Sequence, residues 1–201
     1  MTEPPLTILI PAAGASARMR GLDKLLLEID GQPLLRRTGQ IALAAHPQVL
    51  ITLRPQDAAR RQAVHDLPIT ILTIADAREG LSASLRAGAA FLTGALMILP
   101  ADMPELTAQD LRQMIEAANR SPTDILRATT ADGTPGHPVI FPPDLLPAFA
   151  RLSGDAGARS ILQAHRHRVR LIALPGSHAI TDLDTPEAWA AWRQTTRTGN
   201  P

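Results

Sequence analysis

The sequence predicts an α/β fold, a doubly wound and mostly parallel sheet with helices on both faces. Short β-branched apolar runs alternate with amphipathic helical segments, and no internal repeat or low-complexity linker interrupts the alternation. The first apolar run, residues 7–10, passes directly into a loop of small residues, and ligands of such folds lie outside the carboxyl ends of the strands. The 201 residues suffice for one core, so we expect a single domain over residues 1–201.

Hydrophobic periodicity places the elements along the chain. It predicts helices over residues 34–45, 56–65, 82–93 and 107–119, and strands over residues 49–53, 69–74 and 95–99. After about residue 120 the pattern loosens, because several prolines follow in quick succession: Pro135, Pro138, Pro142, Pro143 and Pro147. We expect this stretch to be a small insertion that covers the site, and the tail after about residue 193 to be frayed.

Composition excludes several classes of function. The formal net charge is +1, with no tyrosine, two tryptophans and three phenylalanines, so neither charge nor base stacking favours nucleic acid as a partner. The absence of cysteine rules out disulfides and thiolate metal sites. No charged segment precedes the first apolar run, and no run approaches the length of a membrane span. We therefore expect a cytoplasmic protein without membrane contact.

The loop after the first predicted strand has the residues of a polyphosphate site. Small side chains leave its backbone N–H groups accessible to phosphate oxygens, and two cations, Arg18 and Lys24, follow. Lys24 is the single lysine in a chain that otherwise uses arginine. The alternative is an alanine-rich surface turn, and neither GxGxxG nor GxxxxGK[ST] is present. The small residues are Ala12, Ala13, Gly14, Ala15 and Ser16.

Carboxylates occur at two further places. Asp102 comes just after the apolar run 95–99, hence at the ligand edge of the sheet, where one or two carboxylates could hold Mg²⁺ together with substrate phosphates. The alternative is an aspartate that caps a turn or helix. Asp182 and Asp184 precede Thr185, which is suited to cap a helix that begins with Pro186. A helix cap explains why a threonine occurs at position 185, but it does not explain either of the two aspartates.

Strings along residues 7–190 resemble the motifs of the MobA-like NTP transferase family. They are AAG, RM and DK in the first loop, GLSASL, DMP, GHPVIF, GDAGAR and DLDTPE. The AAG form of the loop, with GHPV and GDxGAR, resembles the cytidylyltransferases of the molybdenum cofactor within this family. Pro11 departs from the pattern, because most relatives carry an aliphatic or small residue there, and it removes one backbone donor.

The resemblance implies a Rossmann-like nucleotidyltransferase fold and a role for each motif. Lys24, Arg18 and Asp102 are the implied catalytic residues, and Asp102 and Asp184, the latter preferred to Asp182, are the implied ligands of Mg²⁺ or Mn²⁺. The implied acceptor-binding residues are His137, Gly154, Asp155 and Arg159. The implied nucleotide-binding residues are Ala12, Ala13, Gly14, Ala15, Arg18, Lys24, Gly80, Ser82, Ser84 and Asp102. From the residues alone, GLSASL also fits an ordinary Ser-capped helix, and His137 a loop histidine.

The implied reaction transfers CMP from CTP to a phosphate-bearing acceptor, molybdopterin, and releases pyrophosphate. The expected partners are these small molecules, with a transient contact to a molybdoenzyme or its chaperone. One alternative keeps the reaction but uses GTP or another acceptor such as a sugar phosphate. Another is a non-catalytic nucleotide- or cofactor-binding chaperone module, whose mark would be a lost lysine or metal carboxylate, and the chain has both residues.

Overall fold

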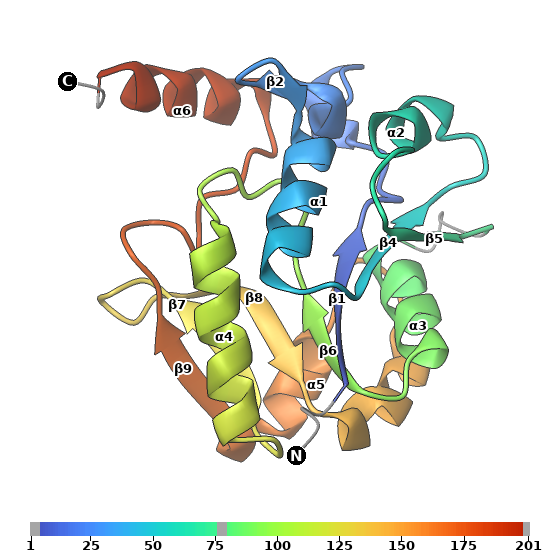
Figure 1. The fold of residues 1–201 in the computed structure, drawn as a ribbon, viewed down its shortest axis with the longest axis vertical. Coiled ribbons are helices and arrows are strands. Elements are labelled where there is room, and N and C mark those ends of the chain that lie inside the picture. The colour runs from blue at the N-terminus through green and yellow to red at the C-terminus, as the bar shows by residue number, and fades with distance from the viewer. Residues whose placement is uncertain (1–4, 76–79, 199–201) are drawn as a thin grey trace.

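A seven-stranded sheet in the order β5-β4-β1-β6-β8-β7-β9 runs through the computed structural model, which describes residues 5–75 and 80–198 (Figure 1). β8 is antiparallel to both of its neighbours, β6 and β7, and the other neighbouring pairs are parallel. The predicted mostly parallel sheet is therefore confirmed. The bounds are β1 Leu6–Pro11, β2 Glu28–Ile29, β3 Gln32–Pro33, α1 Leu34–Ala45, β4 Val49–Leu53, α2 Ala58–Ala63, β5 Thr70–Thr73, α3 Leu81–Phe91, β6 Ala95–Ile98, α4 Ala108–Arg120, β7 Ile125–Thr129, β8 Pro135–Phe141, α5 Arg159–Ala164, β9 Val169–Ala173 and α6 Pro186–Thr198.

Alternate residues of β1 divide the core into two layers. Ile8 and Ile10 belong to the layer that α1 and α4 cover, whereas Leu9 belongs to the layer covered by α3 and the 3₁₀ helix Pro143–Arg151. All three side chains are fully buried. Since burying an aliphatic side chain of this size contributes about 1.5–3 kcal/mol, β1 is held from both faces. The loop that follows it is thereby fixed at the carboxyl edge of the sheet.

The first half of the chain follows the predicted order of elements. α1 and β4 have the predicted bounds, and α4 begins one residue later than predicted because Thr107 is its N-cap. Thr107 and Asp110 form a capping box, in which each side chain accepts a hydrogen bond from the backbone N–H of the other. α2 is shorter than the predicted 56–65, because the carboxylate of Asp57 turns back to accept a hydrogen bond from the N–H of Arg54.

The stretch after residue 120 differs from the predicted covering insertion. β7, β8 and β9 complete the sheet, and only residues 142–168 between β8 and β9 are inserted, where they cover one face. The buried run Val139, Ile140 and Phe141 pairs with β6, and it supplies side chains to both layers of the core. Pro135 falls beyond a shift of register in the β7–β8 pair, and prolines are tolerated in a sheet at such irregularities. The prediction of a loop from the prolines was therefore wrong at Pro135 and Pro138, which lie in β8.

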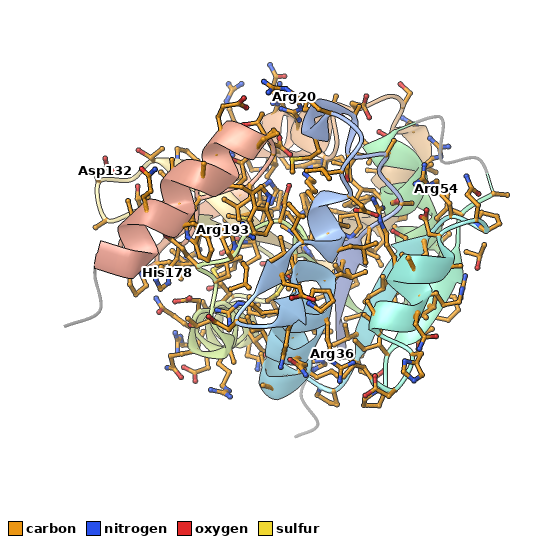
Figure 2. All side chains as sticks on the ribbon, turned by 90° about the horizontal axis from the view of Figure 1, so that it is seen from above. Arg20, Arg36, Arg54, Asp132, His178 and Arg193 are labelled. Atoms are coloured by element: carbon orange, nitrogen blue, oxygen red, sulfur yellow. The ribbon has the colours of Figure 1, made fainter. Side chains whose placement is uncertain are left out.

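The C-terminal helix α6 continues to Thr198, beyond the residue at which the chain was expected to fray. Trp189 is buried in a cluster with residues of the first loop and α1, and the Arg193 guanidinium lies 5.0 Å from the centre of its ring. Arg193, which is labelled in Figure 2, also donates a hydrogen bond to the Glu28 carbonyl of β2, at 3.1 Å. These contacts anchor the helix. No helix of the described residues is long and apolar enough to cross a membrane.

Candidate active site

In the loop after β1, two carbonyl groups contact the Arg60 guanidinium, and three successive amide groups have no acceptor in the described part of the chain. Its first amide, that of Ala12, donates to the Thr52 carbonyl at 3.1 Å and so continues the pairing with β4. The carbonyls of Ala12 and Gly14 accept hydrogen bonds from the Arg60 guanidinium. Within the described residues the N–H groups of Ala13, Gly14 and Ala15 have no acceptor. A run of free amides of this kind is suited to bind an anion.

Four of the predicted site residues form one ionic cluster beside this loop. The ammonium group of Lys24 contacts Asp102 Oδ2 at 2.5 Å and also contacts Asp184 Oδ1. Arg18 Nη2 lies 2.6 Å from the other carboxylate oxygen of Asp184. The side chains of Lys24, Asp102 and Asp184 are 17%, 16% and 20% exposed, so they are partly shielded from water but accessible to a ligand. Residues far apart in the sequence thus meet as predicted.

Burial and charge pull the pKa values of this cluster in opposite directions. For Lys24, burial lowers the pKa, but the ion pairs with Asp102 and Asp184 outweigh it and raise the pKa above its ordinary value. For Asp184, burial raises the pKa, but Lys24 and Arg18 outweigh it and hold the pKa below its ordinary value. No ion pair joins Asp182 to a cation of residues 5–75 or 80–198. Burial, Asp184 and Asp102 raise its pKa above the ordinary value.

The segment that carries Asp184 is fastened to the segment that follows β6. The N–H of Leu183 donates to the Asp102 carbonyl at 3.0 Å. Farther along, the hydroxyls of Ser177 and Thr181 donate to the Glu105 carboxylate, and His178 Nδ1 lies 2.8 Å from a carboxylate oxygen of Asp110. These bonds explain why two carboxylates from distant parts of the chain reach the same ammonium group.

The segment predicted to bind the acceptor accepts hydrogen bonds from the first amides of α3. Gly80 has φ of +77°, and a Cβ atom there would lie 1.9 Å from Asp155 Oδ1, so the position requires glycine. The N–H of Leu81 donates to that oxygen, and the N–H of Ser82 donates to the Gly154 carbonyl. Ser82 and Ser84 were predicted to bind the nucleotide, but they are buried, at 0% and 3% exposure. Residues 77–79 of the same motif lie outside the described residues.

A cavity of about 700 Å³ lies between α3, β7, β8 and α5, and the predicted acceptor residues His137, Asp155 and Arg159 line it. Arg127 and Arg166, which were not among the predicted acceptor-binding residues, line it as well. Burial and the charge of Arg159 lower the pKa of Arg127. Burial and the charge of Arg127 lower the pKa of His137, whereas Asp102 raises it. Arg127, Arg159 and Arg166 outnumber Asp155 in its lining, so the cavity is cationic. Asp102 of the ionic cluster is close enough to His137 to act on its pKa.

Sequence reasoning missed Arg60, the most buried charged residue of the site. Its side chain is 2% exposed, and it contacts the loop after β1 and Asp23, the residue before Lys24. Arg60 lies on the short polar helix α2, where an arginine is ordinarily solvated. Arg60 reaches the loop only through contacts between residues far apart in the sequence, so no local sequence pattern could have revealed its role.

The donor set of the ionic cluster suits a divalent cation. Asp102 and Asp184 both contact the same ammonium group, so their oxygens can share one positive charge. Among the described residues no group of three or more His, Asp or Glu side chains is placed to hold a metal ion. Mg²⁺ commonly takes one or two carboxylates and completes its shell with water and substrate phosphates, so a pair of carboxylates is sufficient.

Comparison with known proteins agrees with this geometry. The MobA-like NTP transferase domain matches residues 8–169. A molybdenum cofactor guanylyltransferase of Pseudomonas fluorescens (strain Pf0-1) is 30% identical over 191 residues, which cover 92% of each chain.

Solved structures agree as well. The crystal structure of Rv0371c from Mycobacterium tuberculosis H37Rv is 29% identical, covers 95% of this chain and 98% of its own, and has a TM-score of 0.83. A complex of Rv0371c with manganese has a TM-score of 0.78 at 29% identity, over 94% of this chain and 98% of its own. The chain belongs to the MobA-like NTP transferase family and is a nucleotidyltransferase.

Proposed function

We propose that this protein transfers CMP from CTP to the phosphate group of a molybdopterin-type acceptor and releases pyrophosphate. The observation that carries the proposal is the cluster of Lys24, Asp102 and Asp184 beside a loop whose amides at residues 13–15 have no acceptor among the described residues. The loop offers donors to a triphosphate, and the cluster lies where the charge of the reaction would develop. The names of relatives, molybdenum cofactor guanylyltransferases, support molybdopterin as the acceptor.

The reaction needs positioning and charge neutralisation more than acid–base catalysis. An oxygen of the acceptor phosphate attacks the α-phosphorus of the nucleotide, a new P–O bond forms, and the bond to the bridging oxygen of pyrophosphate breaks. Because the acceptor oxygen is already ionised, no general base is required. Lys24 and Arg18 neutralise the phosphates, and the amides of Ala13, Gly14 and Ala15 orient them.

Asp102 and Asp184 would hold Mg²⁺ or Mn²⁺. When bound, the ion would neutralise phosphate charge at the reacting centre. The manganese complex of the similar protein Rv0371c supports a divalent metal in this family. Asp184 is the better candidate than Asp182, because it shares the Lys24 ammonium with Asp102.

The cationic cavity supports an anionic acceptor. Arg127, Arg159 and Arg166 line it, and the carboxylate of Asp155 accepts a hydrogen bond from the N–H of Leu81. Its volume of about 700 Å³ is in the ordinary range for a small-molecule site. The arginines of this cavity could therefore bind the phosphate monoester of the acceptor.

Two candidate substrates, CTP and GTP, differ in the base of the nucleotide. The methyl group of Ala13 is buried with Ile74 and Ala83, in the corner between the loop and α3. It narrows this corner relative to glycine, which supports the smaller pyrimidine base and hence CTP. The guanylyltransferase names of relatives favour the second candidate, GTP.

One assay tests the proposal and both candidates. The purified protein is incubated with Mg²⁺, molybdopterin and each of the four nucleoside triphosphates in turn, and pyrophosphate is measured. We expect release with CTP. Release with GTP in place of CTP would favour the second candidate. Binding of nucleotide without release by any of the four would exclude molybdopterin as the acceptor and leave another acceptor or a non-catalytic module.

A further inference from the structure

The Arg60 guanidinium group donates hydrogen bonds to four residues of the loop after β1. Its Nη1 donates to the carbonyls of Ala12 and Gly14, at 2.6 and 2.7 Å. Its Nη2 donates to Ser16 Oγ at 3.2 Å and to Asp23 Oδ1 at 2.9 Å, and its Nε donates to Asp23 Oδ2 at 2.7 Å. All three nitrogens of the guanidinium group are therefore used, and the side chain is only 2% exposed.

The direction of these bonds determines which way the loop amides point. In a trans peptide, the C=O of one residue and the N–H of the next lie in one plane and point in opposite directions. Because the Ala12 carbonyl points at Arg60, the N–H of Ala13 points away from it, and the Gly14 carbonyl places the N–H of Ala15 in the same way. These are two of the amides without an acceptor in the described part of the chain.

The same guanidinium group also fixes the position of Lys24. Asp23 accepts two hydrogen bonds from Arg60 and a further one from the N–H of Leu25 at 3.1 Å, which caps the 3₁₀ helix Lys24–Leu26. The charges of Arg60 and Asp23 compensate each other, so Arg60 adds little net charge to the site. Its effect is geometric, because one planar group sets the relative positions of the loop and of Lys24.

We propose that Arg60 is a positioning residue that holds the loop after β1 in its triphosphate-binding conformation, with its amides outward and in register with Lys24. The inference rests on the proposed function and deepens it. Arg60 itself does not touch the ligand in this account, because it lies behind the loop with its donors already occupied.

The test uses inorganic tripolyphosphate, a probe without base or sugar, and measures its dissociation constant by calorimetry. Arg60→Lys keeps the charge but cannot bridge two carbonyls and a carboxylate. We expect it to weaken binding about 10- to 100-fold, by analogy with the loss when the outer-shell partners that orient metal ligands are mutated. Arg61→Met is the matched control on the same helix. Within the described residues the Arg61 side chain donates only to Thr73 Oγ1, and we expect unchanged binding.

A second variant covers the case in which Arg60→Lys does not fold. Asp23→Asn keeps the hydrogen bonds from Arg60 to the two carbonyls but weakens the Arg60–Asp23 ion pair, which fixes the position of Lys24. It should bind tripolyphosphate less tightly than the wild type, and a folded Asp23→Asn protein with wild-type affinity would overturn the inference. The thermal midpoint and the hydrogen exchange of the amides of residues 13–15 are measured on each folded variant.

A positioning role predicts that tripolyphosphate slows exchange of these amides in the wild type but not in Arg60→Lys. A folded Arg60→Lys protein with wild-type affinity and protection would overturn the inference and leave the proposed function intact. Conversely, a wild type that binds tripolyphosphate but never releases pyrophosphate would refute the proposed function alone.

Discussion

Replacing Lys24 with alanine should change the affinities for triphosphate and for metal in opposite directions. In this structure the ammonium group contacts Asp102 and Asp184 together and neutralises both carboxylates. When a triphosphate binds, we expect the same ammonium to neutralise phosphate oxygens, while the carboxylates turn to the cation. We therefore expect Lys24 to occupy the place proposed for the metal until the nucleotide arrives. Its removal should weaken the binding of triphosphate and strengthen the binding of metal.

The expected magnitude follows from the contacts. A hydrogen bond to a charged group contributes about 1.5–3 kcal/mol, which is a factor of about 10 to 150 in a binding constant. Lys24→Ala should therefore raise the dissociation constant for CTP by that factor. It should also lower the dissociation constant for Mn²⁺ in the absence of nucleotide, about 10-fold, because two partly shielded carboxylates then lack their cation.

Calorimetry with CTP alone and with Mn²⁺ alone measures the two constants separately. Lys24→Arg is the matched control, because it keeps the charge but replaces a compact group by a broad planar one, and it should restore CTP binding only in part. Equal CTP affinity in Lys24→Ala and the wild type would refute the role of Lys24. Weaker Mn²⁺ binding in the variant would refute the idea that Lys24 occupies the metal position.

Three further predictions concern the carboxylates and the base. Asp102→Asn should fold normally but lose pyrophosphate release; wild-type turnover would reduce Asp102 to a turn-capping residue. Ala13→Gly should shift the ratio of CTP to GTP use toward GTP by about 10- to 200-fold in a competition assay, the range for one methyl group in a pocket, and an unchanged ratio would remove the steric explanation. Because burial, Asp184 and Asp102 raise the pKa of Asp182, its charged form is disfavoured in the folded protein. Asp182→Asn should therefore unfold at a higher temperature than the wild type at pH 7. The difference should shrink as the pH falls through this raised pKa and the wild-type carboxyl becomes neutral, and a difference that grows on acidification would contradict the pKa direction.

The sequence was sufficient to predict the elements that carry local signals. The bounds of α1 and β4 follow from periodicity, and the loop after β1 follows from its small residues. The family motifs predicted that Lys24, Asp102 and Asp184 act together, and the structure brings them into contact. Each of these features depends on residues close in sequence or on a motif that marks its position.

The features that were missed depend on contacts between distant residues. Pro135 and Pro138 favoured the prediction of a loop, but both lie in strand β8. The strand forms because Val139 is buried and pairs with β6, and a shift of register between β7 and β8 accommodates Pro135. Arg60 resembles any solvated arginine until the fold buries it under the loop, 46 residues away from Gly14. Trp189 likewise anchors the predicted frayed tail through a cluster that local periodicity does not show.

Isotope transfer tests the central claim most directly. The acceptor is prepared with ¹⁸O in its phosphate group and incubated with CTP, Mg²⁺ and the protein, and the products are analysed by mass spectrometry. If an acceptor oxygen attacks the α-phosphorus, the product is the acceptor joined to CMP with all of the label retained, and the pyrophosphate is unlabelled. Label in the pyrophosphate, or no nucleotidyl adduct with any of the four nucleoside triphosphates, would contradict the account.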